Sequence, residues 1–260
     1  MNDNLANMGS AQVRRVEVAG ESFIEKINAS PIEYHFYHNA AETLRAAGVD
    51  IPNLITSNET NHYLLLEFIP LPVAQEEIAH DDVLKVLANL HCQCRHSHYA
   101  FKRHTWSEQA NEQAIELLQL SGAGAVQLIT LQKRSDEIFS SEALISGDSN
   151  AGNWGRRTNG GLVLFDWERF GLGSPAIDLA PLIKGMGHWV EYESIARRYK
   201  NFCPRVRIEK LTREIALSKA WIATEVINIL FSTAKPELNL YLNWYRNFLP
   251  AWLKEIARKI

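Results

Sequence analysis

The sequence predicts an α+β protein with two lobes, a small β-rich lobe that contains one helix and a larger helical lobe. Two observations carry this prediction. Residues 12–69 hold short apolar runs that alternate or are rich in branched side chains, as strands are. After Pro72 the apolar residues instead recur every three or four positions, as in amphipathic helices. Prolines at 70 and 72 end the last apolar run, so the expected domains are residues 1–69 and 70–260.

The small lobe is expected to begin with two antiparallel strands over "QVRRVEVAGESFIEKI" (12–27), which alternates on both sides of a glycine. A helix is expected over 30–48, because Ser30 can cap its first turn and Pro31 suits the first helical position. Gly48 is a suitable residue for its end. Further strands are expected over 51–55 and 62–72.

The large lobe is expected to be helical apart from a short β region near residues 143–170. The helix that starts near Thr105 has Glu108 three residues later, which is the spacing of a capping box. Ser174 and Pro175 are well placed to begin another helix. The other helical segments are expected over 80–94, 124–140 and 188–260.

Composition excludes several classes of protein. The first ten residues are polar, so no signal peptide is expected. The sequence contains no run of eighteen apolar residues, so no membrane span is expected either. Three cysteines, an odd number, suit a reducing cytoplasm better than a disulfide framework. We therefore expect a cytoplasmic protein without a membrane partner, either a monomer or a homodimer.

Charge is unevenly distributed along the chain, although the net charge is only −3. Residues 1–180 hold 13 Lys and Arg against 23 Asp and Glu, whereas residues 181–260 hold 14 against 7. A basic third could bind nucleic acid. Its basic residues come singly or in pairs, however, which favours solvated helix faces, and no nucleic-acid partner is expected.

Candidate functional residues lie in "SGDSNAGNWGRRTNGGLVLFDWERF" (146–170). Asp148 and Asn153 are five positions apart on one loop, and Asp166 follows a short apolar run. A carboxylate that accepts a hydroxyl proton, with an amide and a second carboxylate that bind Mg²⁺, is the set that phosphoryl transfer needs. The alternative is that these side chains only cap turns.

The same stretch, with "GLVLFDWERFGLGSPAIDLA" (161–180), resembles the aminoglycoside phosphotransferase/choline kinase family of protein-kinase-like small-molecule kinases. The resemblance covers residues 7–185 and implies a kinase-like fold. It also implies transfer of the γ-phosphoryl group of ATP or GTP to a hydroxyl of a small molecule, with Mg²⁺. In that interpretation Asp148 is the catalytic base, and Asn153 and Asp166 bind the metal.

The resemblance also implies a nucleotide site in the small lobe. Gly9 and Ser10 would lie over the phosphates, and Lys26 would contact the α- and β-phosphates. Glu33 or Glu42 would pair with Lys26, and Glu33 is favoured. Adenine would bind to backbone groups of the linker between the lobes, at Glu67, Phe68 and Ile69.

Departures from the family pattern leave a second function open. Ser146 stands where the family usually has a histidine that braces the loop, and the phosphate turn has a single glycine at position 9. A non-catalytic pseudokinase that binds nucleotide as a regulatory module is therefore the alternative. It would bind nucleotide without turnover.

A third hypothesis concerns "HCQCRHSHYAFKRH" (91–104), where Cys92, Cys94, His96 and His98 alternate. Such side chains bind Zn²⁺, but structural zinc sites usually have two to four residues between their cysteines. The zinc hypothesis is therefore disfavoured.

The acceptor is left open by the sequence. A quaternary ammonium group would need an aromatic cage, for which Trp189, Trp221 and Trp244 are candidates, although aromatic residues at helical spacing are more often core. The basic character of residues 181–260 argues against a polycationic aminoglycoside. A hydroxylated metabolite, amino alcohol or antibiotic is the expected class.

Overall fold

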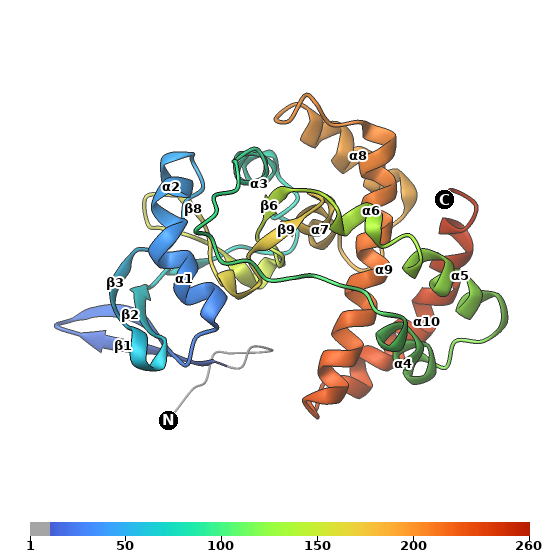
Figure 1. Ribbon diagram of the computed structural model, residues 1–260, viewed down its shortest axis with the longest axis horizontal. Helices are drawn as coiled ribbons and strands as arrows, with labels where there is room; N and C mark the ends of the chain where they lie inside the picture. The colour runs from blue at the N-terminus through green and yellow to red at the C-terminus, as the bar shows by residue number, and fades with distance from the viewer. Residues whose placement is uncertain (1–10) are drawn as a thin grey trace. The chain divides into compact units, whose positions relative to one another are not determined.

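The structure is a computed structural model and describes residues 11–260 (Figure 1). The chain divides into two compact units. Unit 1 contains the described part of Met1–Arg103 together with Ala143–Leu172, and unit 2 contains His104–Glu142 together with Gly173–Ile260. The loop that carries Asp148 and Asn153 therefore belongs to the same unit as the N-terminal strands. The division of the sequence into lobes at 69/70 stays a prediction.

Unit 1 contains a four-stranded antiparallel sheet with the order β1-β2-β4-β3. Its first two strands form the predicted hairpin, with Ala19 and Gly20 at positive φ in the turn. The strands are β1 (Gln12–Val18), β2 (Glu21–Ile27), β3 (Leu54–Asn58) and β4 (Tyr63–Glu67). The α+β prediction for this part of the chain is confirmed.

The predicted helix over 30–48 forms as two consecutive helices, α1 (Pro31–Asn39) and α2 (Ala41–Ala46). Ser30 caps the first of them, because its side chain accepts a hydrogen bond from the N–H of Glu33 at 3.1 Å. The backbone hydrogen bonds continue across the junction at Ala40. Gly48 follows at φ +84°, the left-handed conformation that favours glycine after a helix.

The prediction of one strand over 62–72 is wrong beyond Glu67. The chain leaves the first sheet there, and β5 (Leu71–Pro72) pairs instead with β7 (Trp154–Arg156). Proline lacks an N–H group, so Pro70 and Pro72 could not have donated to the ladder of the first sheet. A short hairpin partner, β8 (Leu162–Leu164), completes this second sheet, which has the order β5-β7-β8.

The remainder of unit 1 contains one helix, a small two-stranded sheet and short turns. Helix α3 (Asp81–His91) contacts β6 (Ala143–Ile145), which pairs with β9 (Gly171–Gly173). Short 3₁₀ turns lie at η1 (Glu59–Asn61), η2 (Ala151–Asn153) and η3 (Trp167–Arg169). The turn η2 contains Asn153, and η3 begins directly after Asp166.

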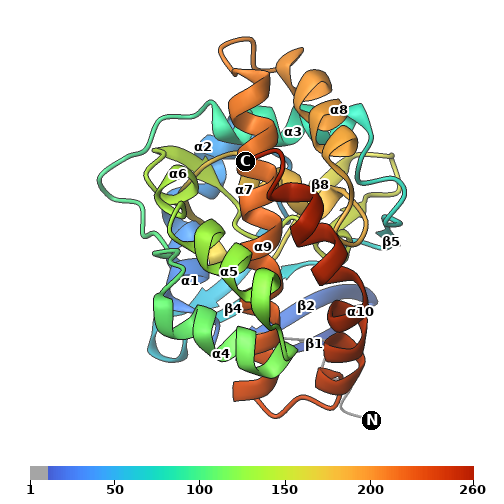
Figure 2. The same ribbon diagram turned by 90° about the vertical axis from the view of Figure 1, so that its right-hand side faces the viewer.

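Unit 2 is helical, and its central helix α9 (Ile208–Ser232) contacts most of the others (Figure 2). The other helices are α4 (Glu108–Leu118), α5 (Gly122–Gln132), α6 (Asp136–Phe139), α7 (Ala176–Leu179), η4 (Ala180–Leu182), α8 (Trp189–Lys200) and α10 (Leu238–Ile256). The helix expected over 124–140 is interrupted between α5 and α6. Its neighbour α4 is capped by Ser107, whose hydroxyl accepts from the N–H of Ala110 at 3.1 Å, and not by Thr105.

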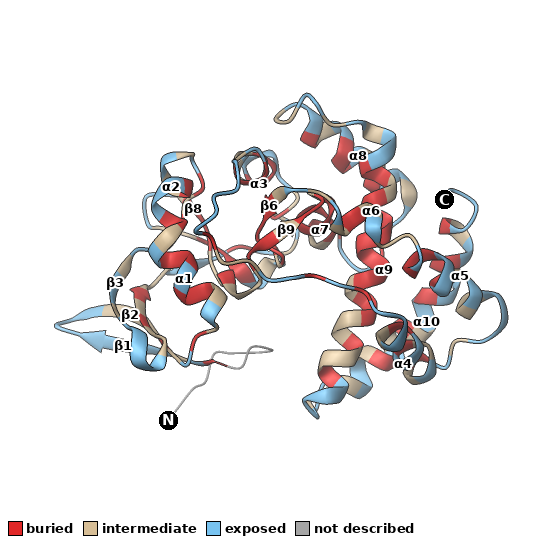
Figure 3. Ribbon diagram, in the orientation of Figure 1, coloured by how far each residue is buried: buried red, intermediate tan, exposed pale blue. Residues whose placement is uncertain are grey.

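Among the described residues, α9 is the one helix that is long and apolar enough to cross a membrane by length and composition alone. Most of that apolar segment is buried inside the protein, as Figure 3 shows by the red colour along the helix. Burial of this kind is expected of the central helix of a packed core.

Candidate functional site

Lys26 is the centre of a buried ion-pair junction in unit 1. Its Nζ atom lies 2.7 Å from Oε1 of Glu33 and 2.8 Å from Oδ1 of Asp166. The side chains of Lys26 and Glu33 are only 8% and 1% exposed, whereas that of Asp166 is 39% exposed. The junction therefore presents one carboxylate to solvent and keeps the other inside.

The elements around this junction explain why these side chains meet. Glu33 lies in the capped first turn of α1, and its Oε1 also accepts a hydrogen bond from the backbone N–H of Trp167 at 3.3 Å. One turn further along α1, the ring of Phe36 stacks on that of Trp167 at 4.1 Å. Helix α1 is thus anchored on the residue that follows Asp166. Glu33 is the partner of Lys26, and Glu42 lies exposed on α2.

The charges of Glu33 and Asp166 change the pKa of Lys26. Burial alone would lower the pKa of Lys26, but the carboxylates of Glu33 and Asp166 outweigh it and raise that pKa well above its usual range. Lys26 is therefore fully charged at neutral pH. A fixed positive charge beside a half-exposed carboxylate suits the binding of a phosphate together with a cation.

Asp148 lies half-buried on the loop before η2, where hydrogen bonds fix its orientation. Its Oδ1 accepts from Nδ2 of Asn150 at 2.7 Å. Nδ2 of Asn153 donates to the backbone oxygen of Asp148 at 2.8 Å. Asn150 also caps η2 through the N–H of Gly152. Asn150 thus caps η2, and its own backbone N–H also bonds to the carboxylate of Asp148, so that carboxylate takes part in the turn as well.

Burial raises the pKa of the Asp148 carboxyl, the charge of Arg169 opposes this, and the charge of Asp166 adds to it. A neighbouring acid, Glu168, has its pKa raised by burial and by the charges of Asp166 and Glu33. These acids thus lie within electrostatic reach of one another. A carboxylate with a raised pKa is a stronger base, which suits proton abstraction from a hydroxyl.

Arg169 was not singled out from the sequence, although it follows the D-W-E motif directly. Its Nε donates to the carbonyl oxygen of Gly147 at 3.0 Å, which braces the loop that carries Asp148. The hydroxyl of Ser146, in the position where the family usually has histidine, accepts from the N–H of Asp148 at 3.3 Å. Arg169 and Ser146 thus both bond to backbone groups of this loop.

Replacing Arg169 by glutamine is expected to move the acidic limb of the pH–rate profile to higher pH. A general base must be unprotonated, so the role predicted for Asp148 implies that activity falls as the pH drops through its pKa. Loss of the neighbouring positive charge raises that pKa further. The measurement is kcat/KM between pH 5 and 9, with Arg169→Lys as the charge-preserving control. An acidic limb that stays in place or moves to lower pH would contradict this role.

Asn153 and Asp166 lie close together, since the N–H of Phe165 donates to the backbone oxygen of Asn153 at 3.0 Å. The amide nitrogen of Asn153 is bonded to Asp148, so its amide oxygen is the atom that could bind a metal. Asp166 adopts φ +66°, the left-handed region that non-glycine residues rarely use and that is enriched at functional sites. One carboxylate and one amide oxygen fit Mg²⁺, which keeps several waters and takes further ligands from phosphates.

The predicted adenine-binding segment follows β4. The N–H of Glu67 is already bonded to the carbonyl oxygen of Asn53 at 2.9 Å, so a contact with adenine would use the other backbone groups of Glu67, Phe68 and Ile69. The guanidinium of Arg15 lies 4.3 Å from the centre of the Phe68 ring. The predicted phosphate contacts at Gly9 and Ser10 lie outside the described residues.

The other candidates from the sequence contribute less. Among residues 11–260 the structure contains no group of three His, Cys, Asp or Glu side chains that could hold a metal ion by themselves. The rings of His96 and His98 stack on each other at 5.4 Å. Trp221 is buried in unit 2 against Phe139, so it cannot face a ligand there.

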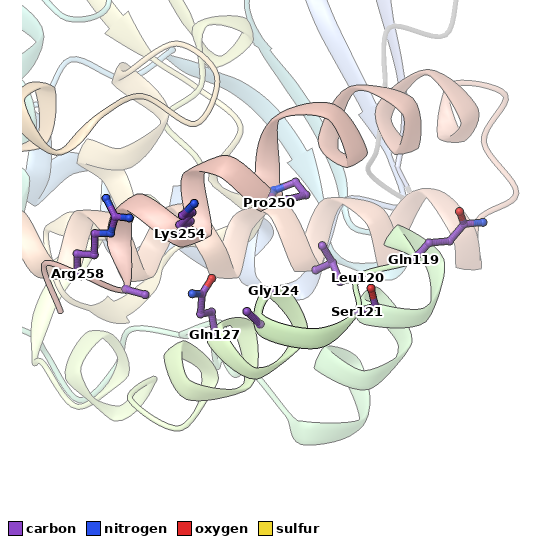
Figure 4. Close-up of a pocket in the computed structure, with 10 residues that line it drawn as sticks. Gln119, Leu120, Ser121, Gly124, Gln127, Pro250, Lys254 and Arg258 are labelled. Atoms are coloured by element: carbon purple, nitrogen blue, oxygen red, sulfur yellow. The ribbon is translucent and has the colours of Figure 1, made fainter.

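A cavity of about 560 Å³ lies in unit 2 between the start of α5 and the end of α10 (Figure 4). It is lined by Gln119, Leu120, Ser121, Ala123, Gly124, Gln127, Pro250, Lys254, Ala257 and Arg258. This lining contains no carboxylate and no histidine that could act as a general base. The chemistry-bearing groups are instead gathered in unit 1.

Comparisons with known proteins show the family and the fold of the chain. The sequence model of a family described as "Phosphotransferase enzyme family" matches residues 6–206. No curated protein sequence is significantly similar to the chain.

Solved structures share the fold of the chain at low sequence identity. Choline kinase LicA from Streptococcus pneumoniae has a TM-score of 0.61 at 15% identity, with 96% of this chain and 92% of that chain covered. An ethanolamine kinase from Plasmodium vivax has a TM-score of 0.66 at 13% identity, with 98% and 83% covered. A spectinomycin phosphotransferase, solved with ADP and spectinomycin, has a TM-score of 0.65 at 12% identity, with 100% and 92% covered. The predicted kinase-like fold is confirmed.

Proposed function

Because the chain belongs to the phosphotransferase enzyme family, we propose that it transfers the γ-phosphoryl group of ATP or GTP to a hydroxyl group of a small molecule. The observation that carries this proposal is the Lys26–Glu33–Asp166 junction next to Asp148. A charged lysine, a half-exposed acid and a separate half-buried acid are the groups that phosphoryl transfer requires.

Asp148 is the residue proposed to act on the acceptor. Its carboxylate accepts the hydroxyl proton as the acceptor oxygen bonds to the γ-phosphorus and the bond to the β-phosphate oxygen breaks. Burial raises its pKa, which strengthens it as a base, while the charge of Arg169 and the hydrogen bond from Asn150 oppose that rise and favour the ionised form. The proton ends on Asp148 and is later lost to solvent.

Lys26, Asn153 and Asp166 are proposed to hold the phosphates of the donor. The ammonium group of Lys26, kept in place by Glu33, would contact the α- and β-phosphates. Mg²⁺ bound by Asp166 and the amide oxygen of Asn153 would neutralise charge on the phosphates. The ammonium group of Lys26 contacts the carboxylate of Asp166 directly. The proposed phosphate ligand and the proposed metal ligand are therefore already side by side.

Nucleotide donors and hydroxyl acceptors are suggested by the structural relatives. Their structures were solved with AMP, with ADP and spectinomycin, with ADP and hygromycin B, or with GDP. Spectinomycin and hygromycin B are small hydroxylated molecules. So are choline and ethanolamine, which the names of two of the kinases state. A small hydroxylated acceptor is therefore the class that we propose here.

The proposal is tested by thermal melting with ATP, ADP and GTP, each with and without Mg²⁺. Ligand at 100 times its Kd stabilises the native state by about 2.7 kcal/mol, which for a chain of this size is a shift on the order of 5–10 °C. The Mg²⁺-dependent part of the shift is expected to disappear in Asp166→Asn. The matched control is Asp82→Asn, an exposed acid paired with Arg156 in the same unit.

Two results would contradict the proposal. The first is the absence of a shift with every nucleotide at saturating concentration. The second is a shift without release of ADP across a panel of amino alcohols, sugars and antibiotics, which would favour a pseudokinase that binds nucleotide as a regulatory module.

A further inference from the structure

Arg157 lies in the turn between β7 and β8 and binds two distant acids at once. Its Nε and Nη2 atoms donate to Oε1 and Oε2 of Glu67 at 2.6 and 2.9 Å, so the contact with that carboxylate is bidentate. Its Nη1 atom contacts Asp50, and Nη2 also donates to the carbonyl oxygen of Ile51 at 3.3 Å. The side chain of Arg157 is only 20% exposed. Bidentate, partly buried pairs of this kind are among the stronger polar contacts in proteins.

Glu67 is in turn fixed by a second set of bonds. Its Oε2 accepts from the backbone N–H of Asn53 at 3.0 Å and from the side-chain amide of Asn53 at 2.9 Å. The contact with Arg157 holds the pKa of this carboxyl below its usual range, so the pair stays charged near neutral pH. The side chain of Glu67 is thereby fully occupied by protein contacts, and the segment that begins at this residue starts from a fixed point.

The rest of that segment also packs closely against β7. A Cβ atom added to Gly155 would lie 2.6 Å from Cγ2 of Ile69 and 3.2 Å from the carbonyl oxygen of Leu71. The pairing of β5 with β7 holds Leu71 opposite Arg156. The backbone from 67 to 72 is therefore held at both ends by the β7–β8 hairpin.

The same hairpin connects the two candidate metal ligands. Strand β7 begins immediately after Asn153, and β8 ends two residues before Asp166. Any displacement of the hairpin relative to Glu67–Ile69 would therefore change the distance between the predicted base-binding backbone and the metal-binding side chains.

We propose that Arg157 is a positioning residue that keeps the base-binding segment Glu67–Ile69 in register with Asn153 and Asp166. This inference rests on the proposed function, because it concerns the same nucleotide site. Arg157 contacts no substrate; it acts through Glu67 and Asp50. Lysine would be a poor substitute, since one ammonium group cannot reproduce a planar contact with both oxygens of Glu67 and with Asp50.

The test compares ligands that contain a base with one that does not. Dissociation constants are measured by calorimetry for ATP and for inorganic triphosphate, both with Mg²⁺, on the wild type, Arg157→Gln and Arg157→Lys. The matched control is Arg156→Gln, which removes a neighbouring arginine whose partner is the exposed Asp82. We expect Arg157→Gln to weaken ATP binding about tenfold, the usual effect of a 1.4 kcal/mol loss. Binding of triphosphate should stay within twofold, Arg157→Lys should recover part of the loss, and Arg156→Gln should resemble the wild type.

The contrary results are equally specific. Equal weakening of ATP and triphosphate, or no weakening of either in a folded Arg157→Gln protein, would overturn the positioning role. If Arg157→Gln does not fold, Glu67→Gln removes the charge and one of the two acceptor oxygens of the pair, and it must then show the same selective loss of ATP binding for the inference to stand. Failure of the wild type to bind any nucleotide would instead overturn the proposed function, and this inference with it.

Discussion

Replacing Asp148 by asparagine is expected to lower the acceptor-dependent turnover by about 10²–10⁴-fold, the usual contribution of a general base. Asparagine keeps the shape of the side chain but cannot take the hydroxyl proton. The proposed nucleotide contacts involve other residues, so the Mg²⁺-dependent thermal shift expected with ATP should be retained. The measurement is kcat from acceptor-dependent release of ADP, together with melting temperatures.

The stability of this variant separates a catalytic role from a structural one. Burial raises the pKa of Asp148, so its charged form costs stability at pH values above that pKa. Removing the charge should leave the melting temperature unchanged or raise it, as is common for groups kept for activity. Turnover within threefold of the wild type, or a clear loss of stability with unchanged turnover, would rule out Asp148 as the base.

Replacing Lys26 by methionine is expected to affect both activity and stability. Loss of a fixed charge on the phosphates should lower turnover by about 10²–10³-fold, as for other preorganised electrostatic contacts. Breaking a buried ion pair by removing one partner typically costs about 3–5 kcal/mol, because Glu33 is left buried without its counter-ion. Chemical denaturation and steady-state kinetics measure the two effects separately.

The pH dependence of this destabilisation has a definite sign. Without Lys26, burial keeps the pKa of Glu33 in the folded protein above its unfolded value of about 4.3. The penalty is therefore full above the folded pKa and is relieved as the pH falls toward the unfolded value. Destabilisation that grows at acidic pH would contradict this account.

A double variant tests the pair directly. Lys26→Met with Glu33→Gln removes the uncompensated charge, so it should be more stable than Lys26→Met alone while its turnover stays low. The surface variant Lys85→Met, on the exposed side of α3, is the matched control and should change neither quantity. Recovery of turnover in the double variant would contradict the proposal that Lys26 contacts the phosphates.

Local features of the fold were predictable where short-range physics decides them. The β1–β2 hairpin follows from alternation around Gly20, and the start of α1 follows from Ser30 and Pro31. Boundaries failed where contacts distant in sequence decide them. Pro70 indicated the end of a strand, but nothing local indicated that Leu71–Pro72 would pair with β7, more than eighty residues away.

The site divides in the same way. Asp148, Asn153 and Asp166 are recognisable from the sequence because their spacing reflects one loop and one strand end, which are local structures. Their partners are not local. Arg169 on the carbonyl of Gly147, and Arg157 on Glu67 across ninety positions of the chain, have no signature in spacing. Charged side chains of this kind look solvated in a sequence until the fold brings a carboxylate or a carbonyl group to them.

By itself the sequence determined the class of protein, the order of its elements and the residues proposed to carry the chemistry, because helix caps, strand alternation and short motifs depend on neighbours along the chain. The resemblance favoured Glu33 as the partner of Lys26, and only the tertiary structure showed that Lys26 also meets Asp166. It also decided that Asp148 is buried enough for its pKa to rise. The reason is physical: ion pairing and desolvation depend on distances in space and on burial, and neither is fixed before the chain has packed.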